Sequence, residues 1–184
     1  EFAKIDERNA RRLAADTLEM CAIIQGARDS AAENARRILL SELARLGHVR
    51  LLDVSAEAEI SPEGNPGDVR AARIPELAFG EEKLSLVLDG NGRIAGSAGR
   101  AAEILDALKS DTGLDFSIFL RLNDAGDMLR VASTVGDSGG GRRVGDYIPA
   151  AGAEGSQMVR AALSKRAYSG AVRFGGCLLY TSPS

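Results

Sequence analysis

The chain has 184 residues, 45% of them hydrophobic and 27% charged, so it is long enough to form a domain with a real core and too apolar for a disordered protein. Its net charge is only −3, from 23 basic and 26 acidic residues, which argues against a nucleic-acid-binding protein because these carry a basic face. The two cysteines and the single histidine lack metal-ligand spacing, so we expect neither a metal site nor a cofactor.

The first predicted element is one long helix over residues 5–46, which contains no proline and many alanine, arginine, leucine and glutamate residues. Apolar residues recur along it at spacings close to three and four, which predicts a single apolar seam. Gly47 is the expected C-cap. A helix of about 40 residues is about 60 Å long, so part of residues 1–47 must face a partner, a second subunit or a membrane-proximal stalk.

Short strands are expected in the region that follows. Residues 56–60 alternate as a strand, and residues 69–74 form the returning strand, which Pro75 is expected to end. Residues 84–88 are a further apolar strand, and the sequence Asp-Gly-Asn-Gly at 89–92 is a strong turn signal.

Residues 100–108 form a clear amphipathic helix, with Ser97 as a candidate cap and Gly113 as its expected end. The next two strands, 116–122 and 128–134, are joined by Asn-Asp-Ala-Gly-Asp and make the clearest hairpin of the sequence.

A strand at residues 143–148, a short helix at 157–164 and a last strand at 168–174 complete the series. The order of elements predicts an α+β fold with an antiparallel sheet and helices on one side. A parallel doubly wound sheet is disfavoured because the hairpin connections are too short for crossovers.

Two stretches resemble a known family. Residues 113–135, GLDFSIFLRLNDAGDMLRVASTV, look like the central hairpin of Cache sensor domains, and the closest type is the Cache 3/Cache 2 class of bacterial methyl-accepting chemotaxis receptors. RRVGDYIP at residues 142–149 and YSGA at 168–171 match the motifs that follow in that family. The resemblance is strong over residues 100–174, fair over 56–99 and generic for the N-terminal helix.

The chain also departs from the family pattern. Leu120 stands where the family has glutamine, and Asp146 stands where it has threonine, so specificity differs from that of relatives if either position faces the ligand. The family sheet ends with one more strand, whereas residues 177–184, CLLYTSPS, resemble a translated sequencing adaptor. We therefore expect a truncated C-terminal strand and a non-native tail at 177–184.

The resemblance implies a PAS-like sensor domain over residues 48–176 that encloses a small polar or anionic metabolite between one sheet face and overlying loops. It also implies a homodimer formed through the N-terminal helix. Membrane segments outside this chain would anchor the parent protein in the bacterial inner membrane, with the domain facing the periplasm or the exterior. No nucleic acid and no cofactor are implied.

Five residues are candidate ligand contacts, because they can present a charge, a hydroxyl or an aromatic surface from the strands of this region: Phe119, Arg121, Arg130, Tyr147 and Tyr168. Strand alternation puts Phe119 and Arg121 on one face, and Arg130 shares a face with Ala132. Two arginines facing inward would favour a carboxylate or a similar anion. The alternative is that they are cross-strand neighbours on the solvent face of the sheet.

The leading hypothesis is thus a chemoreceptor sensor that binds a small metabolite and signals by displacing a helix. The same domain on a histidine kinase or a cyclic-dinucleotide enzyme is a close alternative, and a soluble cytoplasmic PAS- or GAF-like module is a more distant one. An enzyme is disfavoured, because no nucleophile and base can be paired when the chain has one histidine.

Overall fold

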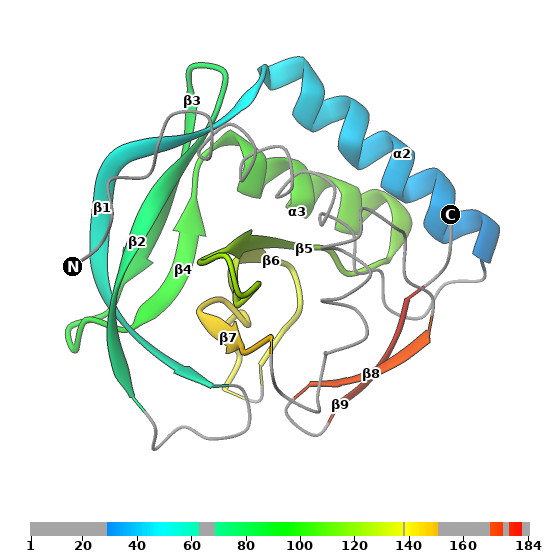
Figure 1. Ribbon diagram of the computed structural model, residues 1–184. Helices are drawn as coiled ribbons and strands as arrows, with labels where there is room; N and C mark the ends of the chain where they lie inside the picture. The colour runs from blue at the N-terminus through cyan, green and yellow to red at the C-terminus, as the bar shows by residue number, and fades with distance from the viewer. Residues whose placement is uncertain (1–28, 63–68, 138, 151–169, 175–176, 182–184) are drawn as a thin grey trace.

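The computed structural model describes residues 29–62, 69–137, 139–150, 170–174 and 177–181 (Figure 1). These residues form two helices and nine strands, in this order: α2 (Asp29–Leu46), β1 (Val49–Pro62), β2 (Arg70–Phe79), β3 (Glu82–Leu88), β4 (Ile94–Ala98), α3 (Arg100–Thr112), β5 (Ser117–Arg121), β6 (Met128–Ser133), β7 (Asp146–Ile148), β8 (Gly170–Phe174) and β9 (Cys177–Thr181). The predicted helix at 157–164 and the part of the long helix before residue 29 lie outside the described residues.

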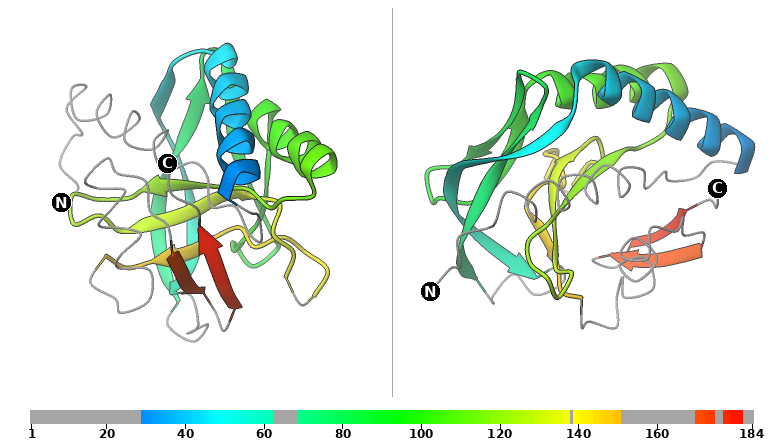
Figure 2. Two further views of the ribbon diagram at one scale, coloured as in Figure 1. Left: turned by 90° about the vertical axis from the view of Figure 1, so that its right-hand side faces the viewer. Right: turned by 45° about the horizontal axis from the view of Figure 1, so that its top comes forward.

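Seven strands form one sheet in the order β4-β3-β2-β1-β7-β6-β5. Neighbouring strands pair antiparallel, except that β1 and β7 pair in parallel over a short stretch. Strands β8 and β9 form a separate antiparallel pair, on the side away from α2 and α3 (Figures 1 and 2). The predicted α+β fold with a mostly antiparallel sheet is confirmed.

The two helices lie beside each other on one side of the sheet (Figure 2). Helix α2 buries Ala35, Leu39 and Leu43 at a spacing of four residues, the helical repeat that keeps side chains on one face. Helix α3 adds Leu105 and Leu108, and together with the inward side chains of β1–β6 they make one continuous core. Each fully buried leucine contributes about 1.5–3 kcal/mol to folding, so this layer fixes where α3 sits against the sheet.

Glycines end both helices, as predicted. Helix α2 stops at Leu46, directly before Gly47. Helix α3 stops at Thr112, and the C-cap residue Gly113 has a left-handed backbone (φ 71°) that lets its N–H donate to the carbonyl of Lys109 at 2.8 Å. The start of α3 differs from the prediction, because Ser97 lies within β4, paired with Leu86, and Gly99 is the N-cap residue. Ser97 is therefore not the cap.

Pro75 does not end its strand, contrary to the prediction, since β2 continues to Phe79. The pairing of β1 with β2 shifts register between Leu51 and Ser55, and Pro75 lies opposite Ser55 at that irregularity. A proline cannot donate a ladder hydrogen bond, and strands tolerate it at such bulges. Strand β1 is correspondingly much longer than the predicted segment 56–60.

The last strand of the main sheet is shorter than the predicted segment 143–148. Gly145, directly before β7, has a φ of 89°, which is incompatible with an extended strand. Its N–H donates to the carbonyl of Arg130 on β6 at 2.8 Å. The chain therefore enters the sheet only at Asp146, which sets the position of that carboxylate beside β6.

Candidate functional site

The hairpin β5–β6 has two faces of different character. Ile118, Leu120 and Leu129 point toward α2 and α3 and belong to the continuous core. Phe119 and Arg130 are cross-strand partners that are just as buried, yet they lie outside that core. Side chains alternate along a strand, so the hairpin presents a second, distinct face on the side away from the helices. We call this second face, with its continuation onto β7, the site face.

A β-bulge decides which residues reach the site face. Ile118 pairs with Ala132, but the next residue, Phe119, pairs with Arg130, so Val131 is an extra residue of β6. Such an insertion reverses the side-chain alternation downstream of it. Ala132 therefore belongs to the core, and the expectation that it shares a face with Arg130 is wrong.

Arg130 is the largest fully buried side chain of the described residues, at 1% exposure. Its Nη1 lies 3.0 Å from Oδ2 of Asp146 on β7, and its guanidinium lies 5.2 Å from the ring centroid of Phe119. Nε of Arg143 approaches the same Asp146 oxygen at 3.2 Å. The alternative that Arg130 lies on the solvent face of the sheet is therefore wrong.

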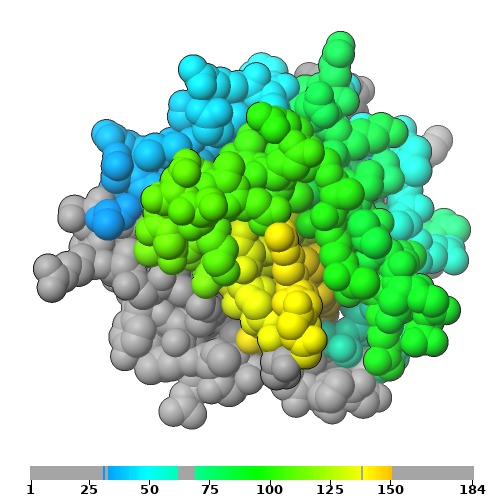
Figure 3. All heavy atoms as spheres, turned by 180° about the vertical axis from the view of Figure 1, so that it is seen from behind, coloured from blue at the N-terminus to red at the C-terminus, as the bar shows by residue number. Residues whose placement is uncertain are grey.

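In the Arg130–Asp146–Arg143 cluster, two guanidinium groups face one carboxylate. Arginine stays protonated in proteins, so burial cannot discharge it. The side chains of Asp146 and Arg143 are 22% and 16% exposed. The segment between β6 and β7 that carries Arg143 reaches the surface next to α3 (Figure 3), so the cluster extends from a buried arginine to the solvent.

Two serine hydroxyls lie at the other end of the site face. Ser117 and Ser133 are directly opposite each other on β5 and β6, both almost fully buried, and their Oγ atoms are 2.9 Å apart. Oγ of Ser133 also accepts a hydrogen bond from the N–H of Val135 at 3.1 Å. Buried hydroxyls that pair with each other can also exchange hydrogen bonds with a bound polar group.

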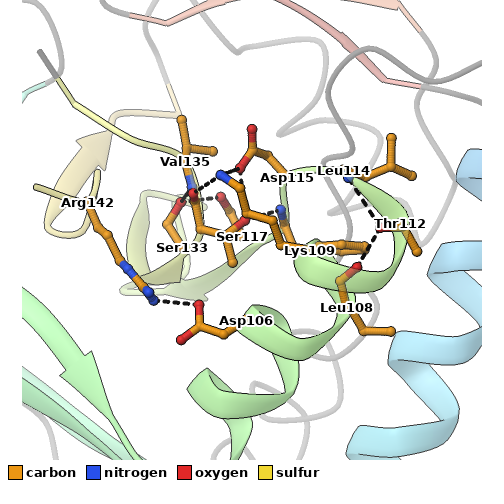
Figure 4. Close-up of polar contacts among 12 residues, drawn as sticks. Asp106, Leu108, Lys109, Thr112, Leu114, Asp115, Ser117, Ser133, Val135 and Arg142 are labelled. Carbon is orange, nitrogen blue, oxygen red and sulfur yellow. Dashed lines mark hydrogen bonds and ion pairs between the residues drawn. The ribbon is translucent and has the colours of Figure 1, made fainter. Parts of the chain in front are cut away.

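A polar network connects this end of the hairpin to helix α3 (Figure 4). Nζ of Lys109 donates to Oδ1 of Asp115 at 2.6 Å and to the carbonyl of Thr134 at 2.8 Å. The hydroxyl of Thr134 donates to the same Asp115 oxygen and accepts from the N–H of Phe116. The last turn of α3 is thereby fastened to the start of β5 and to the end of β6.

Arg121 and Tyr147 make contacts of a different kind. The guanidinium of Arg121 donates to the carbonyls of Asn123 and Asp124, so it holds the turn between β5 and β6. Tyr147 pairs with Leu129 and packs against the core, on the face of β7 opposite the site face. The fifth candidate, Tyr168, lies outside the described residues. Of the five candidates, Phe119 and Arg130 are therefore the pair that the structure brings into contact.

Asp127 accepts hydrogen bonds at the end of the same turn, from the hydroxyl of Tyr147 at 2.6 Å and from the N–H of Ala150 and Nδ2 of Asn123, both at 2.8 Å. Burial opposes the charged carboxylate, but these hydrogen bonds outweigh it. The pKa of Asp127 therefore lies below the usual value for an aspartate. Asp127 thus ties the hairpin turn to β7 and to the residue that follows Pro149.

Sequence reasoning did not identify Asp146, Arg143 or Ser133 as members of the site. Asp146 is noted there only as a departure from the family pattern. The usable signal is strand alternation in the segment Asp146–Ile148, which places Asp146 and Ile148 on one face and Tyr147 on the other. Arg143 precedes the strand, so no periodicity marks it.

Two absences in the described part of the chain bear on the kind of site. No group of three or more His, Cys, Asp or Glu side chains that could hold a metal ion occurs in the described part of the chain. No helix in that part is both long enough and apolar enough to cross a membrane.

The sequence of residues 1–181 matches the family model of the Cache 3/Cache 2 fusion domain. No curated protein and no solved structure matches the chain.

Proposed function

Since its match to this model covers nearly the whole sequence, the chain belongs to the Cache 3/Cache 2 fusion domain family, and we propose that it is the extracytoplasmic ligand-sensing domain of a bacterial transmembrane chemoreceptor. Cache domains are non-catalytic modules that sense small molecules outside the cytoplasm. The chemoreceptor output, the membrane anchor and the homodimer through the N-terminal helix are parts of the proposal.

The buried Arg130 is the observation that supports ligand binding most directly. Burying a charged side chain is costly, and proteins keep one where its charge is used or paired. Phe119 supplies apolar surface beside it, the buried Ile148 lies opposite Met128 on the neighbouring β7, and Ser117 with Ser133 supply hydroxyls on the same face. A few convergent polar groups on an apolar floor are what a small-molecule site requires.

The proposed contacts differ in how the geometry supports them. Phe119 and Arg130 are buried together on the site face and are the proposed direct contacts. Arg121 is proposed to act at the rim, where it already orders the hairpin turn. Tyr147 and Tyr168 stay candidates, and Tyr147 would need to release Asp127 before its hydroxyl could reach a ligand.

A route for the signal follows from the packing. Lys109 fastens α3 to the ends of the site strands, and α3 packs against α2 through the shared core. A ligand that binds one arrangement of the hairpin better than another shifts the balance between them by that difference in affinity. We propose that this shift displaces α3, and with it α2 and the N-terminal helix.

Ligand binding is tested by thermal unfolding of the purified domain against a panel of small polar metabolites. A ligand at 100 times its Kd stabilises the folded state by about 2.7 kcal/mol, so the cognate metabolite is expected to raise Tm by several degrees. Arg130→Met should abolish that rise, whereas Arg100→Met, at an exposed ion pair on α3, should retain it. A panel in which no compound raises Tm would contradict the proposal.

The receptor context is tested by sequencing the locus beyond both ends of this sequence. Spans of about 20 apolar residues on each side would establish a transmembrane sensor, and the region after the second span would identify a chemoreceptor, a histidine kinase or a cyclic-dinucleotide enzyme. A reading frame without such spans would favour the soluble cytoplasmic module instead.

A further inference from the structure

The two buried serines of the site face hold one hydroxyl hydrogen more than they use. The Oγ atoms of Ser117 and Ser133 lie 2.9 Å apart, so one O–H donates to the other oxygen, whichever serine is the donor. Oγ of Ser133 also accepts from the N–H of Val135 at 3.1 Å (Figure 4). Each serine hydroxyl carries one donor hydrogen, so the pair has two and uses one. The second O–H has no acceptor among the residues that the structure describes.

Burial makes this second donor significant. Ser117 and Ser133 are 1% and 2% exposed, and a buried polar group without a partner costs free energy. Proteins give a partner to nearly all such groups, and an exception requires a cause. A binding site that the ligand completes is such a cause, because the ligand supplies the acceptor.

The hydroxyl pair shares its face of the hairpin with Phe119. Ser117 and Phe119 are two residues apart on β5, and the extra residue of the bulge is on β6, so their side chains point to the same side about 7 Å apart. Arg130 lies opposite Phe119, as Ser133 lies opposite Ser117. A small aliphatic ligand that lies on the Phe119 ring can therefore place an oxygen atom at the hydroxyl pair.

The acceptor that fits this pair is uncharged. A buried carboxylate requires several donors or an opposite charge, whereas the two serines offer one O–H and no charge. A carbonyl oxygen is a neutral acceptor that one donor can satisfy. On the basis of the ligand-binding function proposed above, we infer that Ser117 and Ser133 form a donor subsite and that the ligand is a small carbonyl compound whose oxygen accepts from it.

Isothermal titration with 4-oxopentanoate and 4-methylpentanoate tests the subsite. The two anions have the same charge and nearly the same shape, and one carries a carbonyl oxygen where the other carries a methyl group. The unsubstituted protein is expected to bind the oxo acid at least about tenfold more tightly, because the methyl compound leaves the buried O–H without an acceptor. The Ser117→Ala, Ser133→Ala double variant lacks both hydroxyls and should bind the two probes with about equal affinity.

A matched control is the Ser85→Ala, Ser97→Ala double variant. These two serines lie on the paired strands β3 and β4, at the other end of the strand order from β5. Their replacement also removes two strand hydroxyls, but it should leave the ratio of the two affinities unchanged. An equal loss of preference in this control would show that the hydroxyls of the hairpin are not its source, and the inference would fail.

Folding of each variant is checked by circular dichroism. If the hairpin double variant does not fold, infrared spectroscopy of 4-oxopentanoate labelled with carbon-13 at the ketone tests the unsubstituted protein directly. A hydrogen bond lowers the stretching frequency of the ketone, so the bound probe should absorb near its frequency in water. A shift to the higher frequency of a ketone in an apolar solvent would overturn the inference.

The titration overturns the inference if the unsubstituted protein binds both probes equally or binds neither. Retention of the preference in a folded hairpin double variant would overturn it as well. A metabolite without a carbonyl group that raises Tm would then leave the sensor function standing. A failure of every compound to raise Tm would contradict both the sensor function and the subsite.

Discussion

Asp127 shows at the scale of one residue how the hairpin is held to β7. Its carboxylate accepts from Tyr147, Ala150 and Asn123, which belong to a strand, to the segment after it and to the turn. Hydrogen bonds to a charged acceptor are worth about 1.5–3 kcal/mol each when buried, and less when solvent competes for them. The depressed pKa of Asp127 reports this stabilisation, because the hydrogen bonds favour the charged form.

The Asp127→Asn variant is expected to be less stable than the unsubstituted protein at pH 6, by about 1–2 kcal/mol. Because the folded-state pKa of Asp127 is below its unfolded value of about 3.9, its contribution is complete above that value and is lost as the pH falls through the folded-state pKa. The deficit of the variant should therefore shrink toward pH 2.5. Urea unfolding of both proteins at pH 6, 4 and 2.5 measures this difference in the free energy of unfolding.

Asp124→Asn is the control for that experiment. Asp124 belongs to the same turn, but its side chain is fully exposed, and its carboxylate comes no closer than 4.0 Å to the guanidinium of Arg121. Its replacement should change the free energy of unfolding by less than about 0.5 kcal/mol at every pH. A deficit of the Asp127 variant that stayed constant across the pH series would show that its charge is not the source of the stability.

At the scale of elements, two glycines allow α2 to end against the β2–β3 turn. Gly80 has a φ of 64°, and a Cβ atom placed on it would overlap the carbonyl oxygen of Leu46 at the end of α2. A Cβ on Gly47 would lie 2.7 Å from the Cα of Gly80. The N–H of Gly80 also donates to the carbonyl of His48 at 2.9 Å. The helix can therefore pack this close only without side chains at these positions.

Gly80→Ala is accordingly expected to lower the free energy of unfolding by about 2 kcal/mol, from backbone strain and the overlap with Leu46. Urea denaturation followed by circular dichroism measures the change. Gly90→Ala serves as the control, because nothing lies within 4 Å of a Cβ at this exposed turn position, and a change below about 0.5 kcal/mol is expected there. Equal losses in the two variants would disprove the close approach.

The contact between α3 and the hairpin depends on Lys109. The Lys109→Met substitution removes the hydrogen bonds to Asp115 and to the Thr134 carbonyl but keeps most of the length of the side chain. The pair is partly exposed, so the loss of stability should be about 1 kcal/mol. The result specific to the proposed signal route is faster amide hydrogen exchange in Asp115–Ser117 and in the last turn of α3, measured by mass spectrometry.

Arg100→Met on the same helix is the matched comparison. Arg100 forms an exposed ion pair with Glu103 at 2.7 Å, and such pairs contribute less than about 1 kcal/mol. Exchange at the hairpin should be unaffected in this variant. Unchanged exchange after Lys109→Met as well would mean that the apolar core alone couples α3 to the sheet.

Local signals predicted most elements. The Asp-Gly-Asn-Gly turn marks the β3–β4 hairpin, the Asn-Asp-Ala-Gly-Asp turn marks β5–β6, and Gly47 and Gly113 mark two helix ends. Errors occurred where tertiary pairing overrides a local rule. Pro75 breaks a strand in general, but here it lies at a bulge opposite Ser55, and nothing in the local sequence shows where β1 has extra residues.

The sequence pointed to only part of the candidate site, for the same reason. Strand alternation and the family resemblance identified Phe119 and Arg130, which the structure brings into contact. The bulge at Val131 decides that Ala132 faces the core instead, and single-sequence alternation cannot reveal a bulge. The pairing of Arg130 with Asp146 joins β6 to β7 across a loop, so it depends on strand order that local periodicity does not encode.

At the scale of the whole molecule, the sheet separates two environments. The helices cover one side and make the apolar core, whereas the charged cluster and the serine pair occupy the other face of the β5–β6–β7 end. In the proposed sensor, the polar network of Lys109 at the sheet ends would connect the site face to α3, which packs against α2. In the proposed homodimer, the outer surface of α2 would be the place where a change in position is passed to a second subunit.

The proposed homodimer through the N-terminal helix predicts a role for Ile38. Ala35, Leu39 and Leu43 face the core of the same chain, whereas Ile38 is 39% exposed on α2, a position at which an isoleucine can contact a partner helix. The unsubstituted chain is expected to form dimers at micromolar concentrations in light scattering coupled to size-exclusion chromatography. Ile38→Glu should weaken the dimer at least about tenfold, because it places a charge in an apolar contact.

Val87→Glu makes the same chemical change at an exposed position of β3 and should leave the dimer intact. Ile38 is not in the core, so Ile38→Glu should lower the free energy of unfolding only because the association of two subunits is lost. The difference in Tm between this variant and the unsubstituted chain should therefore vanish on dilution. A chain that is monomeric before substitution, or a dimer that Val87→Glu weakens equally, would place the subunit contact elsewhere than on α2.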